Sequence, residues 1–224
     1  MALDPDRLVG EPPFAAVVLA GGPGSRMGHP AKATLTVGGV AMLARVLTAA
    51  ADASPRIVVG PPDGADLPPD VLITVEDPPG GGPVAATAAG LALLRDIDAG
   101  AAVAVLAADL PFLTAADLRT LRSAVSGIGH DGAKPLADAV LVDGAVLVDD
   151  AAHPQWLCGV WRLGALRSRL AAIGDPVGVA MRHLAAGLTV ARRPPAVQAP
   201  PTWFDCDTRD DLRRAEEWVH GDAG

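Results

Sequence analysis

Two cations and a group of glycines lie close together near the start of the chain. In residues 19–32, LAGGPGSRMGHPAK, the cations are Arg26 and Lys32, and the glycines are Gly21, Gly22, Gly24 and Gly28. Glycine lets the backbone approach a ligand closely, so free N–H groups and two cations suit a polyphosphate. The pattern is not a Walker A loop, because no Gly-Lys-Ser/Thr follows the glycines, and its glycine spacing differs from that of the dinucleotide fingerprint. We interpret it as a phosphate-binding loop; the alternative is a plain glycine- and proline-rich surface loop.

A carboxylate at the end of a very apolar stretch is the second candidate for chemistry. Residues 101–107, AAVAVLA, predict a central buried strand, and Asp109 follows it closely. A carboxylate at the C-terminal tip of a buried strand is typical of a metal or ribose site. The alternative role, a helix N-cap, is better filled by Thr114, with Asp117 three residues later. Asp109 is therefore available for chemistry.

Two later loops add polar groups that could reach the same ligand. Asp77 begins a glycine- and proline-rich loop that leads through Gly82 and Pro83 into a predicted helix, and proline suits the first helical position. Asp205 and Asp207 are one residue apart on a predicted extended segment, so their side chains point the same way. Each loop can also be read as a turn with no role in binding.

The remaining pattern predicts the elements that must position these residues. Apolar runs predict strands at 14–20, 56–59, 71–75, 101–107 and 188–191, and helices are predicted at 41–52, 84–95, 162–172, 177–186 and 209–219. Two short strands, 139–142 and 146–148, are predicted as a hairpin turning at Asp143-Gly144 or as a pair of edge strands. The alternation predicts an α/β protein: a single three-layer αβα domain over residues 14–220, with a mostly parallel, Rossmann-like sheet and a small antiparallel element. Residues 1–13 are predicted to be a disordered lead.

Composition restricts the partners and the compartment. A net charge of −8 disfavours a nucleic-acid partner, whereas a small anionic substrate needs only local cations. Cys158 and Cys206 are far apart and form no CxxC motif, which favours reduced thiols over a zinc site or a disulfide. The N-terminal residues lack the features of a signal peptide, and no apolar run is long enough to span a bilayer. We therefore expect a cytoplasmic protein with no membrane partner.

The glycine-rich stretch resembles the signature of the nucleotidyltransferases in their molybdenum cofactor guanylyltransferase form, roughly LAGG-x3-RMG-x3-K. Every spacing is kept, and the matching residues are Leu19, Ala20, Gly21, Gly22, Arg26, Met27, Gly28 and Lys32. One departure is Ala31, where that family often has an acidic residue. Three later segments are similar to family motifs in the expected order: Asp77 with residues 82–85, Asp109 with Pro111 and Phe112, and residues 204–208.

This resemblance implies a Mg²⁺-dependent enzyme that transfers GMP from GTP to a molybdopterin-type cofactor and releases pyrophosphate. It implies catalytic roles for Arg26, Lys32 and Asp109, and Mg²⁺ ligation by Asp109 together with Asp207, which we choose over Asp205. It also implies that the nucleotide contacts Leu19, Ala20, Gly21, Gly22, Gly24, Arg26, Lys32, Asp77 and Gly82. His153 resembles a residue on the pterin side, although a histidine in a proline-flanked turn is more often simply solvated. Transient contact with molybdoenzyme maturation proteins is a further expectation.

Three alternatives remain open from the sequence. The same fold could use CTP with molybdopterin, because the choice of GTP depends only on the Leu-Ala-Gly-Gly form of the first motif. It could use a sugar phosphate as acceptor, although such enzymes usually have a longer second half. It could also be a nucleotide-binding protein without catalytic activity, which would bind nucleotide but show no Mg²⁺-dependent turnover.

Overall fold

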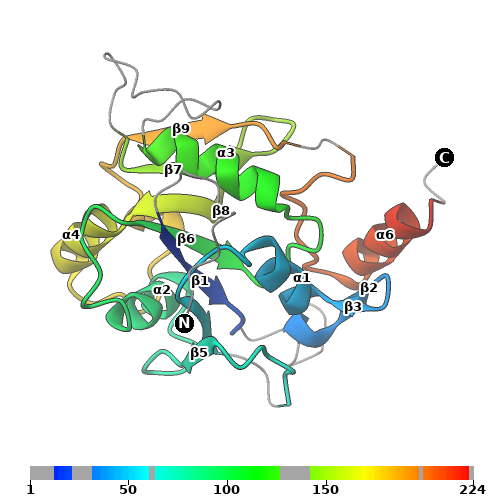
Figure 1. Cartoon of the computed structure of the whole chain (residues 1–224), viewed down its shortest axis with the longest axis horizontal. Coiled ribbons are helices and arrows are strands. Elements are labelled where there is room, and N and C mark those ends of the chain that lie inside the picture. The colour runs from blue at the N-terminus through cyan, green and yellow to red at the C-terminus, as the bar shows by residue number, and fades with distance from the viewer. Residues whose placement is uncertain (1–12, 22–31, 61–63, 127–141, 197–198, 222–224) are drawn as a thin grey trace, which may run out of the picture.

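A seven-stranded sheet with the strand order β5-β4-β1-β6-β8-β7-β9 lies at the centre of the protein (Figure 1). The structure is a computed structural model of the chain, and it describes residues 13–21, 32–60, 64–126, 142–196 and 199–221. The strands of the sheet are β1 (Phe14–Leu19), β4 (Arg56–Val59), β5 (Val71–Thr74), β6 (Ala102–Ala107), β7 (Gly144–Val148), β8 (Pro154–Arg162) and β9 (Val190–Arg193). Strands β5, β4, β1 and β6 are parallel, β8 is antiparallel to both of its neighbours, and β7 and β9 are parallel.

Helices cover both faces of this sheet, and a second, small sheet lies beside it. The helices are α1 (Met42–Ala49), α2 (Pro83–Ala92), α3 (Ala115–Ser126), α4 (Leu163–Ile173), α5 (Met181–Leu184) and α6 (Arg209–His220), with a 3-10 turn, η1, at Lys32–Thr34. The small antiparallel sheet pairs β2 (Thr36–Val37) with β3 (Val40–Ala41). This arrangement confirms the predicted α/β class with a mostly parallel sheet and a small antiparallel element.

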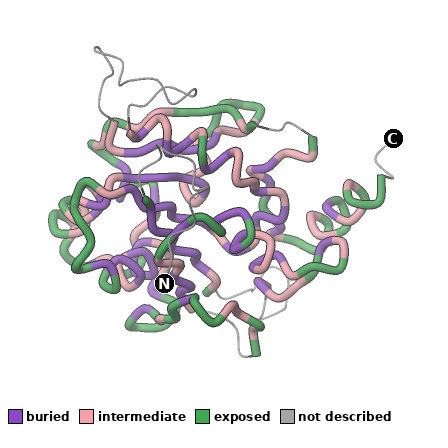
Figure 2. Tube along the Cα trace, viewed as in Figure 1, coloured by how far each residue is buried: buried purple, intermediate pink, exposed green. Residues whose placement is uncertain are grey.

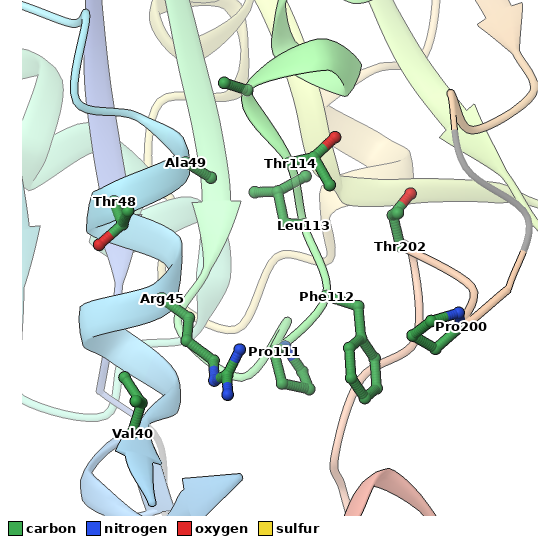
Figure 3. Close-up of a pocket in the computed structure, with 11 residues that line it drawn as sticks. Val40, Arg45, Thr48, Ala49, Pro111, Phe112, Leu113, Thr114, Pro200 and Thr202 are labelled. Atoms are coloured by element: carbon green, nitrogen blue, oxygen red, sulfur yellow. The ribbon is translucent and has the colours of Figure 1, made fainter. Parts of the chain in front are cut away.

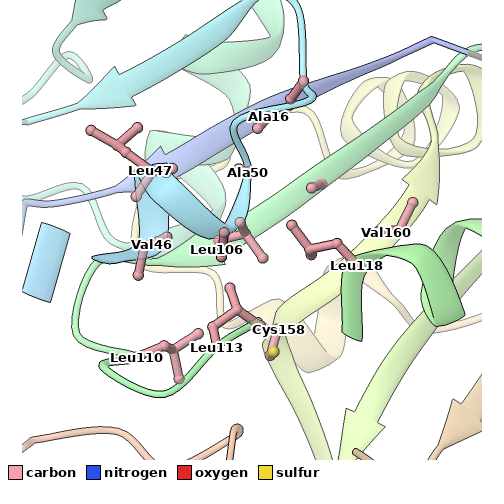
Figure 4. Packing of buried hydrophobic residues seen from close by; sticks show 14 of the residues in the cluster. Ala16, Val46, Leu47, Ala50, Leu106, Leu110, Leu113, Leu118, Cys158 and Val160 are labelled. Carbon is pink, nitrogen blue, oxygen red and sulfur yellow. The ribbon is translucent and has the colours of Figure 1, made fainter. Parts of the chain in front are cut away.

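The central strands are buried on both faces, which explains their unbroken apolar sequences. In β1, Ala16 and Val18 pack into a first cluster with α1 and α3, whereas Ala15 and Val17 pack into a second cluster with α2, α4 and α5. Figure 2 shows these buried strands in the middle of the molecule. Figure 4 shows how the first cluster joins residues of α1 and α3 to Leu106 of β6.

A third cluster attaches the C-terminal segment to the rest of the fold. Its buried members are Val37, Met42, Phe204, Cys206 and Ala215. These residues join β2 and the start of α1 to α6, which lies beside the small sheet in Figure 1. Helix α6 therefore packs outside the two main clusters, next to the segment that precedes it.

Two expectations about the second half of the chain are wrong. The residues Asp143-Gly144 are not a hairpin turn, because β7 starts at Gly144 and pairs with β8 and β9. Residues 139–141 lie outside the described residues. The helix expected at 177–186 is only the four residues Met181–Leu184, and Gly178 before it has a positive φ of 72°, which is incompatible with a continuous helix. Among the helices of the described residues, none has the length and apolar character needed to cross a membrane.

Candidate functional site

The C-terminal ends of β1 and β6 lie side by side and position the first site residues. Leu19 of β1 pairs with Ala107 of β6, and the Ala108 N–H donates to the Leu19 carbonyl at 3.0 Å. Asp109 follows Ala108 directly, so it lies just beyond the end of β6 and next to the end of β1. Ligands of parallel α/β sheets bind beyond these carboxyl ends.

Lys32 contacts two of the predicted carboxylates at once. Its Nζ donates to Asp109 Oδ2 and, at 2.6 Å, to Asp207 Oδ1. The lysine and Asp109 side chains are 20% and 18% exposed, whereas that of Asp207 is 45% exposed, so the group is sheltered on one side and open on the other. Three residues chosen from sequence therefore form one contiguous group.

The C-terminal segment reaches this group through a backbone contact and a capped helix. The Cys206 N–H donates to the Asp109 carbonyl at 3.1 Å, and burial of the Cys206 side chain in the third cluster fixes the segment there. Immediately afterwards, Thr208 and Asp211 form a reciprocal capping box that starts α6. Asp207 is thus held between two anchored points. The predicted capping box of Thr114 and Asp117 is also confirmed at the start of α3.

The charges of the group perturb each other. Burial of the Lys32 ammonium lowers its pKa, but the attraction and hydrogen bonds of Asp109 and then Asp207 outweigh this, so the pKa of Lys32 is raised overall. Asp205 as a whole residue is exposed, but its carboxyl group is partly buried. This burial, together with the charges of Asp109 and Asp207, raises the pKa of Asp205 to about 6. Among the described residues, three carboxyl groups, those of Asp109, Asp205 and Asp207, therefore surround the single ammonium of Lys32.

The donor set suits a hard divalent cation bound together with a substrate. Asp109 Oδ1 is buried and has no hydrogen-bond partner, although the other oxygen of the same carboxylate contacts Lys32. Within the described ranges no group of three or more His, Cys, Asp or Glu side chains forms a complete metal site. Mg²⁺ does not need one, because it is commonly held by one or two carboxylates plus substrate phosphates. Asp109 and Asp207 fit that requirement.

A buried carboxylate near the ends of β1 and β4 was not singled out from the sequence. Glu76 is only 6% exposed; its Oε1 accepts the Gly80 N–H at 3.0 Å, and its Oε2 is buried without a partner. A Cβ on Gly60, whose φ is 65°, would lie 2.9 Å from the Gly21 Cα and 3.6 Å from Glu76 Oε2. Glu76 therefore packs beneath this glycine pair. No sequence pattern indicates this, because an acidic residue after a strand is ordinarily solvated.

The other predicted nucleotide contacts lie at the end of β1, outside the described residues, or in the connection between β5 and α2. Leu19 ends β1, and Ala20 and Gly21 continue from it by donating their N–H groups to the Val59 carbonyl at 2.8 and 3.2 Å. Gly22, Gly24 and Arg26 lie outside the described residues. Asp77 is exposed in the turn before α2, and Gly82 is the N-cap of that helix with a φ of 92°. Asp77 and Gly82 therefore belong to the β5–α2 connection, not to the Lys32 group.

A cavity of about 550 Å³ lies between α1 and the segment that follows Asp109. Its walls are mainly apolar and come from α1, from the segment after Asp109 and from the C-terminal segment (Figure 3). Arg45 lines it, but the guanidinium donates to the Val37 carbonyl through Nε at 3.0 Å and Nη2 at 2.6 Å. The lining includes neither Lys32 nor Asp109 nor Asp207, so the cavity is separate from the charged group.

The histidine expected on the acceptor side directly precedes β8, and the strand itself contains two tryptophans. The His153 side chain is 75% exposed, and its Nδ1 lies 3.3 Å from Asp149 Oδ2. Trp156 and Trp161 stack with ring centroids 6.4 Å apart and pack with the second cluster. The tryptophans therefore serve packing, and His153 is a solvated residue just before β8.

Comparison with known families gives one match that covers most of the chain. The family model described as "MobA-like NTP transferase domain" matches residues 16–192. Among curated proteins, none matches this sequence. The matched range ends before Asp207. The family match therefore covers Lys32 and Asp109 but not the C-terminal segment that contacts them.

Solved structures share the fold at low sequence identity. Molybdopterin-guanine dinucleotide biosynthesis protein A from Archaeoglobus fulgidus superposes with a TM-score of 0.61 at 21% identity, covering 93% of this chain and 100% of that chain. 2-C-methyl-D-erythritol 4-phosphate cytidylyltransferase from Thermus thermophilus gives 0.61 at 20% identity, covering 92% and 99%. A nucleotidyl transferase from Methanothermobacter gives 0.63 at 20% identity, covering 93% and 98%. At these identities the likeness establishes the nucleotidyltransferase fold.

Proposed function

This chain belongs to the family of MobA-like NTP transferase domains, and from that premise we propose that it transfers GMP from GTP to a molybdopterin-type cofactor. The products are molybdopterin guanine dinucleotide and pyrophosphate. The observation that carries the proposal is the contact of one ammonium, Lys32, with two carboxylates, Asp109 and Asp207, at the carboxyl edge of the sheet. These are the residues that a metal- and phosphate-dependent transfer requires.

The reaction makes one bond and breaks one. An oxygen of the acceptor's terminal phosphate bonds to the α-phosphorus of GTP, while the bond from that phosphorus to the oxygen bridging to the β-phosphorus breaks. The acceptor oxygen is already anionic at neutral pH, so no general base is needed. The protein must bring two polyanions together and stabilise the charge that builds on the leaving pyrophosphate.

The residues divide this work between them. Lys32, with Arg26, would bind the β- and γ-phosphates, and the backbone of the glycine-rich stretch would approach them closely. Asp109 and Asp207 would hold Mg²⁺, which supplies neutralisation of phosphate charge when it is bound. The contact between Lys32 and both carboxylates supports this division, because it keeps the phosphate-binding and metal-binding groups adjacent.

GTP is proposed on the Leu-Ala-Gly-Gly form of the first motif, Leu19 to Gly22, and on the likeness to the Archaeoglobus protein. A second candidate is transfer of CMP from CTP, because the Thermus cytidylyltransferase superposes with the same TM-score of 0.61. The two candidates share the mechanism and differ in the base. A sugar-phosphate acceptor and a protein that binds nucleotide without turnover are the remaining alternatives.

The deciding experiment measures pyrophosphate release with Mg²⁺ and molybdopterin cofactor, comparing GTP with CTP, ATP and UTP. Release with GTP alone supports the proposal. Release with CTP alone keeps the mechanism and changes the base. Binding of GTP without release, for every acceptor tried, contradicts the enzymatic proposal and favours a nucleotide-binding protein.

Two variants control this assay. Asp109→Asn is expected to lower turnover by about a hundredfold or more, because it removes a proposed ligand of the Mg²⁺ that neutralises phosphate charge. Arg213→Met is the matched control, because Arg213 is an exposed cation of α6 that pairs with Asp210 and Glu217 of the same helix. Turnover of Arg213→Met should equal that of the unmodified protein.

We also propose that residues 14–220 act as one domain and that the substrates are small molecules, without nucleic acid or membrane. Both cysteines are free and buried, which supports a reducing, cytoplasmic location. Transient contact with molybdoenzyme maturation proteins would follow if the product is molybdopterin guanine dinucleotide.

A further inference from the structure

The Lys32 ammonium occupies the position that a cation would take between the two proposed metal ligands. It contacts one oxygen of Asp109 and one oxygen of Asp207, and these side chains are brought together from distant parts of the chain. A lysine that only bound phosphate would not need to contact both carboxylates. The arrangement is that of an internal counter-ion.

We infer that Lys32 competes with the divalent cation for Asp109 and Asp207, so that the metal binds well only when nucleotide phosphates draw Lys32 away. This inference rests on the proposed function, because it concerns the same metal site. It assigns Lys32 two positions: between the carboxylates before substrate binds, and on the phosphates afterwards.

Three features of the site support this exchange. Lys32 is only the first residue of η1, and the 20% exposure of its side chain leaves a path to the open side of the group. The second oxygen of Asp109 is buried and lacks a partner, so the single positive charge of Lys32 satisfies only part of the acceptor capacity there. A divalent cation balances two carboxylates more fully than one ammonium can.

The exchange has a functional consequence. Binding of nucleotide phosphates and binding of the metal each favour the same position of Lys32, so the two ligands must increase each other's affinity. The site would bind free Mg²⁺ weakly and the nucleotide together with Mg²⁺ strongly. The lysine thereby prevents the metal from occupying the site without its substrate.

The test measures Mn²⁺ binding to the full-length, nucleotide-free protein by the electron paramagnetic resonance signal of free Mn²⁺. Lys32→Met keeps most of the side-chain volume and removes the charge. It is expected to bind Mn²⁺ about tenfold more tightly than the unmodified protein or better, because a positive charge adjacent to both ligands is gone. Lys32→Gln, which keeps a hydrogen-bond donor, should also bind Mn²⁺ more tightly.

Two controls separate this effect from a general change in charge. Arg213→Met removes one positive charge from the exposed face of α6 and should leave Mn²⁺ affinity unchanged. Adding Asp109→Asn to Lys32→Met should abolish the gain, because one of the two ligands is lost. Thermal unfolding gives a second readout: Mn²⁺ should raise the melting temperature of Lys32→Met more than that of the unmodified protein.

The inference is overturned if folded Lys32→Met and Lys32→Gln bind Mn²⁺ no more tightly than Arg213→Met. Mn²⁺ affinity tests this inference, whereas pyrophosphate release by the unmodified protein tests the proposed function, so the two can fail independently. Release without a gain in Mn²⁺ affinity overturns the inference alone. A gain in affinity without release, for any nucleotide, supports the inference and contradicts the proposed transferase activity.

Discussion

Lys32 is separated by 77 residues from Asp109 and by 175 residues from Asp207, yet its ammonium contacts both. Such contacts form only after the sheet and the C-terminal segment are in place. Each carboxylate is supported by its own local structure: Asp109 by the end of β6, and Asp207 by the buried Cys206 and the capped start of α6. The geometry of this group therefore depends on residues that lie outside it.

A comparison of two neighbouring aspartates tests the proposed choice of metal ligand. Asp207→Asn should lower turnover by about tenfold or more, because Asp207 contacts Lys32 and is proposed to hold Mg²⁺. Asp205→Asn should lower it much less. Steady-state pyrophosphate release at saturating GTP measures both, and equal losses in the two variants would argue against the choice of Asp207.

The buried thiol Cys158 gives a prediction about alkaline stability. Burial, with a smaller contribution from the charge of Asp117, raises the pKa of Cys158 above the ordinary value of 9.0. Its contribution to stability is complete below pH 9 and falls as pH rises further, because the unfolded chain then loses the proton first. From this thiol alone, the free energy of unfolding should fall by about 1.4 kcal/mol at pH 10.

Urea unfolding at pH 8 and pH 10 measures this difference, with Cys158→Ala as the matched control. The control should show a smaller loss of stability between the two pH values. The chain has no tyrosine, so no phenol titrates in this window. An equal loss in both proteins would contradict the prediction.

At the scale of elements, close packing of helices on the sheet depends on small side chains. Helix α2 approaches β1 so closely at Gly90 that a Cβ there would lie 2.4 Å from Val17 Cγ1 and 3.2 Å from Val59 Cγ2. Alanine, valine and leucine make up most of the buried residues, in keeping with a chain that is only 3% aromatic. The position of α2 also sets the position of the β5–α2 connection, which carries Asp77 and Gly82.

Gly90→Ala sets two effects against each other. Alanine raises helix propensity by about 1 kcal/mol, but overpacking against β1 costs about 1–3 kcal/mol. Because the site between Val17 and Val59 has no room for a methyl group, we expect net destabilisation. Chemical denaturation of Gly90→Ala and of Ala92→Gly, a change at the exposed end of the same helix, measures the difference. A more stable Gly90→Ala would show that α2 can move away from the sheet.

Local patterns in the sequence predict the structure they form, whereas contacts between distant segments leave no such pattern. The parallel core strands follow from apolar runs, and the capping box of Thr114 and Asp117 follows from Thr-x-x-Asp spacing; both are local signals. The pairing of β7 with β8 and β9 is not a local property, so the Asp-Gly pair at 143–144 predicts a turn where the strand in fact begins. Asp109 and Lys32 were identifiable from their position after strands or glycines, whereas the burial of Glu76 beneath Gly21 and Gly60 depends on three separate segments.

At the scale of the whole molecule, the chain continues beyond the family match into a C-terminal segment that contacts Lys32. The family match ends at residue 192, but Asp207 reaches Lys32 from beyond that point. The third cluster holds the segment in place through an aromatic group: the Trp218 ring lies 5.7 Å from that of Phe112 and 4.9 Å from that of Phe204. Because Phe112 follows Asp109 by three residues, the same packing supports both carboxylates.

Trp218→Ala should therefore affect the site from a distance. The half-buried ring contributes about 2 kcal/mol to the docking of α6, and its loss should increase hydrogen exchange in α6 while that of β6 stays slow. Mn²⁺ affinity in the presence of GTP should fall with it. Trp156→Ala is the matched control, because Trp156 packs with the second cluster; it should lower stability without changing Mn²⁺ affinity. An equal fall in Mn²⁺ affinity in both variants would contradict this account.

The four tryptophans form two pairs whose fluorescence reports on different parts of the molecule. Trp156 and Trp161 stack together with the second cluster, whereas Trp203 and Trp218 belong to the third cluster, close to Asp207 in sequence. With no tyrosine in the chain, near-ultraviolet emission comes from these indoles. One pair reports on the interior of the sheet domain and the other on the docked C-terminal segment. The protein thus carries a fluorescent signal for the docking of its C-terminal segment, with an internal reference in the same spectrum.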